Sequence, residues 1–103
     1  MKIYTITTTT KLGEKNEETG FPDFGSSRVV GFYEDKYTAF SRVMENCCDI
    51  WETIYDYAIV EEVEEGLYPR TEQYFFKYNM ETQLYEPIEK PEAVKHFCNF
   101  SIG

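Results

Sequence analysis

One long segment of this chain places apolar residues at helical spacing, and this restricts the fold more than any other feature. Apolar side chains recur every three or four residues there, at Tyr37, Phe40, Val43, Met44 and Cys47. The spacing predicts an amphipathic helix, and Asp35 is placed to cap its N-terminus. Residues 46–49 (NCCD) are a poor helix interior, so we expect a break there and a short second turn over 49–55. The rest of the core must come from strands.

The other apolar segments are rich in β-branched and aromatic residues, which favour strands. We expect strands at 2–10, 28–33, 57–63, 74–78 and 84–88. Gly31 predicts a bulge or a close backbone approach in the second strand, which should form a hairpin with the first. Residues 79–83 are typical of a hairpin loop between the last two strands. Pro87 lacks a backbone N–H and therefore predicts that the last strand lies at a sheet edge.

In chain order, these elements predict an α+β fold with the order β-β-α-β-β-β, followed by a short C-terminal helix that opens near Pro91. The sheet is expected to be single, mainly antiparallel and of about five strands, with the main helix packed on one face. A length of 103 residues suits a single domain spanning 1–103. Residues 11–27 are rich in glycine, serine and charged residues and predict a long mobile loop without regular structure.

The charge balance argues against several classes of function. Nineteen acidic and ten basic residues give a formal net charge of −9, whereas binding to a nucleic-acid backbone or an anionic membrane needs a surplus of lysine and arginine. The sequence therefore predicts neither direct nucleic-acid binding nor membrane binding. We see no apolar core of a signal peptide and no segment of membrane-spanning length, which favours a cytoplasmic location.

Cysteine and histidine residues raise the question of a metal site. Cys47, Cys48, His96 and Cys98 are of the ligand types that tetrahedral zinc uses. However, adjacent cysteines on a helix point about 100° apart, and the chelating spacing of structural zinc sites is absent. The odd number of cysteines favours reduced, buried thiols. We therefore predict no metal and no cofactor, and the sequence leaves open whether these four residues converge.

A run of glutamates is the second candidate for chemistry. Glu61, Glu62, Glu64 and Glu65 could serve acid–base catalysis or hold a divalent cation if they met in one pocket. Side chains alternate along a strand, so Glu62 and Glu64 should lie on the face opposite to Glu61 and Glu65. No nucleophile motif or phosphate-binding glycine loop accompanies them. The sequence predicts no catalytic residue, and a metal-binding protein or small enzyme is the less favoured alternative.

A protein-binding module is the function that the sequence favours. Residues 45–92 contain thirteen acidic and three basic residues, a net charge of −10, and such a surface attracts a basic partner at a raised rate. The partner would bind either the acidic surface at 49–65 or the exposed aromatic loop at 21–24, and aromatic residues would serve as its anchors. The predicted partner-binding residues are seven acids and three aromatics: Asp49, Glu52, Asp56, Glu61, Glu62, Glu64, Glu65, Phe21, Phe24 and Trp51. An open sheet edge could instead pair two copies of the chain as a homodimer.

A resemblance covers most of the chain. The stretch CDIWETIYDYAIVEEVEEGLYP at 48–69, the upstream RVVGFYEDKYTAF and the aromatic hairpin downstream resemble small uncharacterised proteins of Gram-positive bacteria and their mobile elements. The resemblance implies a compact α+β fold and no particular activity, cofactor or catalytic residue. By analogy with small acidic proteins of mobile elements, a further alternative is an antagonist that imitates the charge of a nucleic acid and blocks a basic DNA- or RNA-binding protein.

Overall fold

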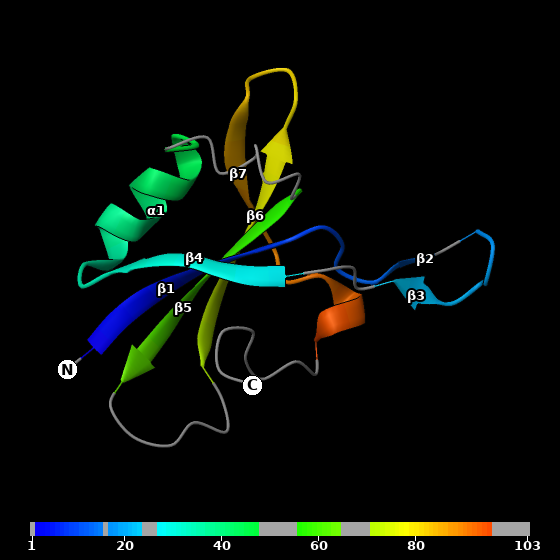
Figure 1. The fold of residues 1–103 in the computed structure, drawn as a ribbon, viewed down its shortest axis with the longest axis horizontal. Coiled ribbons are helices and arrows are strands. Elements are labelled where there is room, and N and C mark those ends of the chain that lie inside the picture. The colour runs from blue at the N-terminus through cyan, green and yellow to red at the C-terminus, as the bar shows by residue number, and fades with distance from the viewer. Residues whose placement is uncertain (1, 16, 24–26, 48–55, 65–70, 96–103) are drawn as a thin grey trace.

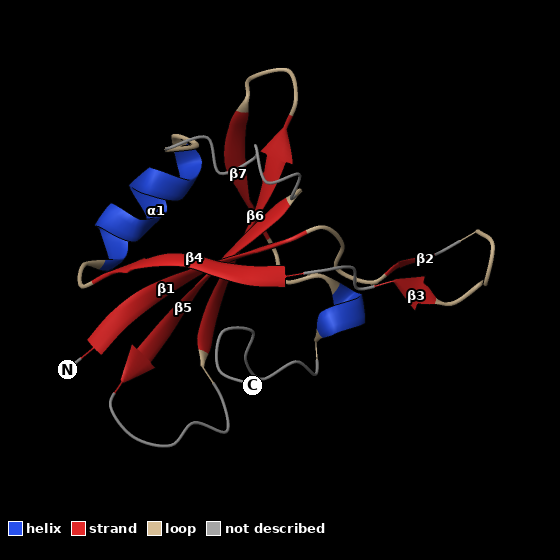
Figure 2. Ribbon diagram, in the orientation of Figure 1, coloured by secondary structure: helices blue, strands red, loops and turns tan. Residues whose placement is uncertain are grey.

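The computed structural model describes residues 2–15, 17–23, 27–47, 56–64 and 71–95. Within them, five strands form one antiparallel sheet (Figure 1), and one α-helix lies against it (Figure 2). The strands are β1 (Lys2–Thr9), β4 (Ser27–Tyr33), β5 (Tyr57–Glu64), β6 (Glu72–Asn79) and β7 (Leu84–Ile88), and the helix is α1 (Lys36–Met44). The predicted α+β class and the single antiparallel sheet are confirmed.

The strands lie side by side in the order β4-β1-β5-β6-β7. β1 pairs with β4 on one side and with β5 on the other, so the hairpin predicted between the first two long strands is present as an antiparallel pair. β7 forms one edge of the sheet, which confirms the prediction from Pro87. The other edge is β4.

The predicted chain order β-β-α-β-β-β is wrong because two short strands come between the first two strands of the main sheet. They are β2 (Glu14–Lys15) and β3 (Pro22–Asp23), which pair with each other. The resulting ribbon projects from the main sheet in Figure 1. The expectation of no regular structure over 11–27 is therefore corrected as well. Two-residue strands are too short to show an alternating pattern, so composition alone indicated a loop.

Helix α1 begins where the sequence predicts. Asp35 Oδ2 accepts hydrogen bonds from the backbone N–H and the hydroxyl of Thr38, each at 2.8 Å, which confirms Asp35 as the N-cap. Asn46 has a φ of 50°, a left-handed conformation that asparagine tolerates and that stops a helix. Cys47 therefore lies beyond the helix, and the predicted second turn over 49–55 lies outside the described residues.

The predicted C-terminal helix is not seen in the described residues. Glu92–Val94 form a single 3-10 turn, and residues 96–103 lie outside the described part. Pro91 comes directly before this turn, and no side chain caps it. The turn nevertheless brings Val94 into a buried cluster with Leu12 and Phe75.

Strand β4 contains the bulge that Gly31 predicts. Ile6 of β1 pairs with Gly31 and the next residue, Thr7, pairs with Val29, so Val30 is the extra residue of β4. Because of this extra residue, Val29 and Phe32 share one face of the sheet although they are three positions apart, and both are exposed. A bulge in an edge strand discourages edge-to-edge pairing. It therefore argues against β4 as the surface that joins two copies.

Apolar side chains cover both faces at the centre of the sheet. The cluster on the helix face contains Tyr4, Ile6, Ala39, Val43, Ala58, Val60, Phe76 and Tyr85. The cluster on the opposite face contains Leu12, Tyr57, Ile59, Phe75 and Val94. Burial on both sides explains why β5 begins with the continuous run YAIV rather than with an apolar–polar alternation.

Replacement of Asp35 by alanine should destabilise the fold, because both hydrogen bonds from Thr38 are lost. The loss of an N-cap costs about 0.5–2 kcal/mol. Urea denaturation followed by circular dichroism measures the free energy of unfolding. Asp35→Asn keeps an acceptor oxygen, so its free energy of unfolding should fall less than that of Asp35→Ala. Equal stability of Asp35→Ala and the wild type would contradict a stabilising cap.

Candidate functional site

The structure separates the glutamates that are grouped in the sequence. Glu61 lies on the sheet face opposite α1 and is fully buried, with 0% of its surface exposed. The hydroxyl of Thr71 donates a hydrogen bond of 2.6 Å to its Oε2. The Glu61 carboxylate therefore belongs to the interior and does not form part of a surface that a partner could touch.

Glu62 and Glu64 lie on the other face and share one lysine. Lys2 Nζ is 3.2 Å from Glu62 Oε1 and 3.3 Å from Glu64 Oε1, and the Tyr4 hydroxyl donates a hydrogen bond of 3.0 Å to Glu62. Partial burial acts to raise the pKa of Glu62, but the hydrogen bonds from Tyr4 and Lys2 outweigh it and hold this pKa below its ordinary value. These two carboxylates are thus partly neutralised within the chain.

Two more of the predicted partner-binding residues are described, and both are exposed: Asp56 and Phe21. Phe21 leaves 71% of its surface exposed and precedes β3 in the projecting ribbon. The other predicted partner-binding residues lie outside the described part of the chain: Asp49, Trp51, Glu52, Glu65 and Phe24. The binding of a basic partner by this acidic set stays a prediction.

Of the four residues considered for zinc, only Cys47 is described. It is half-buried, and Arg42 Nη1 donates a weak hydrogen bond of 3.9 Å to its Sγ. Cys48, His96 and Cys98 lie outside the described residues. Among those residues that are described, no three His, Cys, Asp or Glu side chains are placed to hold a metal ion. The described helices also include none that is long and apolar enough to cross a membrane.

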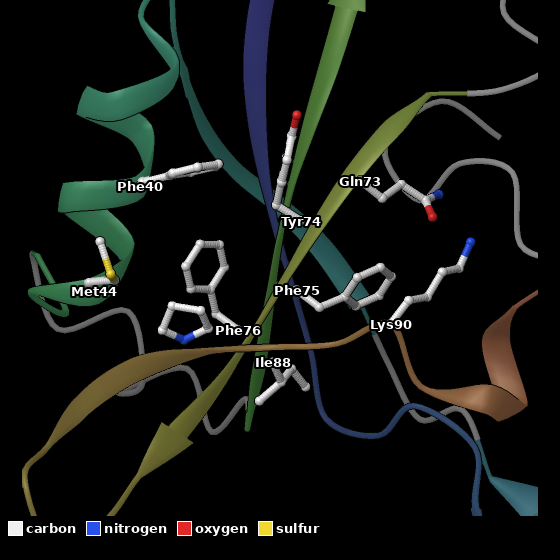
Figure 3. Close-up of a pocket in the computed structure, with 9 residues that line it drawn as sticks. Phe40, Met44, Gln73, Tyr74, Phe75, Phe76, Ile88 and Lys90 are labelled. Carbon is white, nitrogen blue, oxygen red and sulfur yellow. The ribbon is translucent and has the colours of Figure 1, made fainter.

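A groove that the sequence does not predict opens between α1 and the start of β6 (Figure 3). Its volume is about 220 Å³, and its walls are mainly apolar, with Phe40, Met44, Tyr74, Phe76, Pro87 and Ile88. The pairing of β6 with β7 ends at Phe75 and Ile88, whereas its pairing with β5 continues to Glu72. The groove therefore lies where β6 extends past the end of β7.

Lys36 stands beside the aromatic wall of this groove. Its Nζ lies 4.5 Å from the centroid of the Tyr74 ring and 5.7 Å from that of Phe40, which are cation–π distances. The hydrogen-bonding side chain of Tyr74 raises the pKa of Lys36 above its ordinary value, so Lys36 is charged at neutral pH. Within the described part of the chain, no carboxylate forms an ion pair with Lys36.

A second lysine lines the far end of the groove. Lys90 Nζ lies 6.0 Å from the centroid of the Phe75 ring, and Figure 3 shows the two side chains next to each other. Lys90 follows the end of β7, where the chain leaves the sheet. Two cations thus flank an apolar surface in a chain whose net charge is −9.

The size and lining of the groove limit what it can hold. Its volume is below the roughly 300–1,000 Å³ typical of sites that enclose a drug-sized ligand, so it fits a single large side chain. The polar side chains among the described residues that line it are those of Gln73, Tyr74 and Lys90. The lining supplies apolar contact, and the lysines supply charge.

Sequence reasoning misses the groove because it assigns the lining residues to the core. Alternating Tyr74 and Phe76, and the helical spacing of Phe40 and Met44, are typical of packed interiors. Phe40 does pack edge-to-face on Tyr74 and Phe76, with ring centroids 4.9 and 5.6 Å apart. The available signal was Pro87, which indicates an edge strand and hence a β6 that could be left partly uncovered.

Comparisons with known protein families, curated proteins and solved structures find no match to this chain. The predicted resemblance to small proteins of Gram-positive bacteria therefore stays a prediction.

Replacement of Glu62 by glutamine should change how stability depends on pH. Because the folded-state pKa of Glu62 lies below its ordinary value of 4.5, the charged group stabilises the fold above that value. The contribution is lost as the pH falls through the folded-state pKa. Glu62→Gln should thus be less stable than the wild type at neutral pH, and the two should converge in acid.

Thermal denaturation from neutral to acidic pH measures this difference. Glu81→Gln, an exposed substitution in the β6–β7 loop, is the matched control and should follow the wild type. A stability difference for Glu62→Gln that does not vary with pH would show that the ion pair and the hydrogen bond are not formed in solution.

Replacement of Thr71 by valine should destabilise the fold by about 1–3 kcal/mol, because the buried Glu61 carboxylate loses a hydrogen-bond donor. Valine keeps the shape of threonine, so the packing changes little. Thr71→Ser retains the hydroxyl and should recover much of the loss in urea denaturation. If Thr71→Val were as stable as the wild type, the hydrogen bond between Thr71 and Glu61 would make no net contribution to the stability of the fold.

Proposed function

We propose that this protein is a non-catalytic protein-binding module and that the groove between α1 and β6 receives a large apolar side chain of its partner. One observation carries the proposal: charged Lys36 lies 4.5 Å from the Tyr74 ring, beside a mainly apolar groove. Apolar anchors that enter pockets contribute much of the energy of protein association. A cation at the rim adds recognition of charge next to that anchor.

The partner that suits this groove presents an aromatic residue flanked by acidic residues. A carboxylate that approaches Lys36 would form a charge-assisted hydrogen bond, whereas a basic segment would bring like charges together. The attraction is local, because the net charge of −9 repels an acidic partner at longer range. We keep the cytoplasm as the proposed location, as the sequence predicts.

This partner differs from the basic one that composition suggests. The described glutamates of β5 are less suited to bind a basic partner, because Glu61 is buried and because Glu62 and Glu64 share Lys2. The proposal therefore places docking beside β6 and not at the acidic end of β5.

The peptide acetyl-Asp-Asp-Phe-Asp-Asp-amide tests the proposal against the isotope-labelled protein. Titration should shift the NMR amide signals of Met44, Tyr74 and Phe76. The analogue with alanine in place of phenylalanine should bind at least about tenfold more weakly, because burial of a phenylalanine side chain contributes about 1.5–3 kcal/mol. The analogue with four lysines in place of the aspartates should also bind more weakly than the acidic peptide.

Three variants give the controls. Met44→Trp fills the groove with a larger side chain and should abolish the shifts, and Lys36→Glu should reverse the preference between the acidic and basic peptides. Arg28→Glu, a charge reversal on the exposed part of β4, should bind like the wild type. Shifts that survive Met44→Trp, or no shifts with any peptide at millimolar concentration, would overturn the proposed site.

A further inference from the structure

The chain itself carries a segment with the chemistry that suits the groove. Residues 17–21 (EETGF) connect the two strands of the β2–β3 ribbon, and all five are exposed. The segment presents two carboxylates, from Glu17 and Glu18, followed by the aromatic ring of Phe21, which is 71% exposed. In Figure 1 the ribbon points away from α1. The ribbon therefore lies away from the helix that forms one wall of the groove.

The turn that carries Phe21 is formed in advance of binding. Gly20 has a φ of 76°, which glycine adopts without strain. The backbone N–H of Phe21 donates a hydrogen bond of 3.3 Å to Thr19 Oγ1. Nothing lies within 4 Å of the position that a Cβ of Gly20 would take, so the outer side of the turn is open. A preformed turn lowers the entropy cost of docking.

We propose that Phe21 of one copy inserts into the groove of a second copy, with Glu17 and Glu18 beside Lys36 of that copy. The inference rests on the proposed function and names its partner as this same chain. A single aromatic side chain matches a groove of about 220 Å³. The two carboxylates of Glu17 and Glu18 complement the charge of the lysines that flank the groove.

The contact is heterologous, since the ribbon of one copy meets the groove of another. This distinguishes it from pairing through the β4 edge, which would join the same strand of both copies. The bulge at Val30 bends β4 and disfavours that pairing. A heterologous contact also has two separable halves, and each half can be removed in a different variant.

Sedimentation velocity of two variants, alone and mixed, tests the proposal. Phe21→Ser keeps the groove and loses the anchor, whereas Met44→Trp keeps the anchor and loses the groove. The wild type should associate as its concentration rises from micromolar to millimolar, and each variant alone should stay monomeric. An equimolar mixture should form a dimer that grows no further, because one complementary pair remains. Phe32→Ser, which removes an exposed ring from β4, should associate like the wild type.

Charge reversal gives a second route that does not depend on the folding of Met44→Trp. Lys36→Glu should weaken self-association at least about tenfold, a change of about 1.4 kcal/mol. A chain with Glu17→Lys and Glu18→Lys should self-associate as weakly as Lys36→Glu does. The two variants should bind each other when they are mixed. Circular dichroism confirms that each variant is folded.

The outcomes separate this inference from the proposed function. Self-association as strong as that of the wild type in Phe21→Ser or in Lys36→Glu, or folded variants that fail to bind one another when mixed, would overturn the contact. A wild type that stays monomeric while the acidic phenylalanine peptide still binds the groove would overturn the second copy as the partner and leave the proposed function standing. If neither association nor peptide binding occurs, both are wrong.

Discussion

Burial of strand β5 on both of its faces governs where the other elements lie. Ala58 and Val60 belong to the cluster beneath the helix, whereas Tyr57 and Ile59 belong to the cluster on the opposite face. Neither cluster is complete without residues from outside β5. The helix must therefore cover one side, and the segments that carry Leu12 and Val94 must cover the other. A face left open would expose a continuous apolar surface to water.

The groove follows from where β7 ends. β7 pairs with β6 only as far as Phe75, whereas β5 pairs with β6 as far as Glu72, so the start of β6 has no neighbour on that side. α1 packs on β1, β4, β5 and β7, and the rings of Phe40 and Tyr74 fill part of the space toward the start of β6. The space left over is the groove, so it is a consequence of the architecture.

Ion pairs and hydrogen bonds within the chain decide which charges can meet a partner. Composition counts every carboxylate of 45–92 as surface charge, but Glu61 accepts a hydrogen bond from Thr71 in the interior, and Lys2 bridges Glu62 and Glu64. Lys36 is in the opposite situation. It packs against aromatic rings, and no described carboxylate lies within ion-pair distance of it, so its positive charge can attract a carboxylate of another molecule.

Features that depend only on residues close together in the sequence could be predicted from the sequence. The Asp35 cap, the long strands, the bulge beside Gly31 and the edge position of Pro87 follow from side-chain periodicity or from backbone chemistry, which act over a few residues. The β2–β3 ribbon was not predicted, because two-residue strands are stabilised by their pairing and leave no periodic pattern.

The alternation of the glutamates along β5 could be predicted, but the burial of Glu61 could not, because burial depends on what packs over that face. The groove likewise joins Phe40 and Met44 of α1 to Tyr74 of β6, about thirty positions later in the sequence. The amino-acid sequence was thus sufficient for the conformation of each long element. The accessible charges and the binding surface came from packing between distant elements, because side chains far apart in sequence meet only when the sheet and helix assemble.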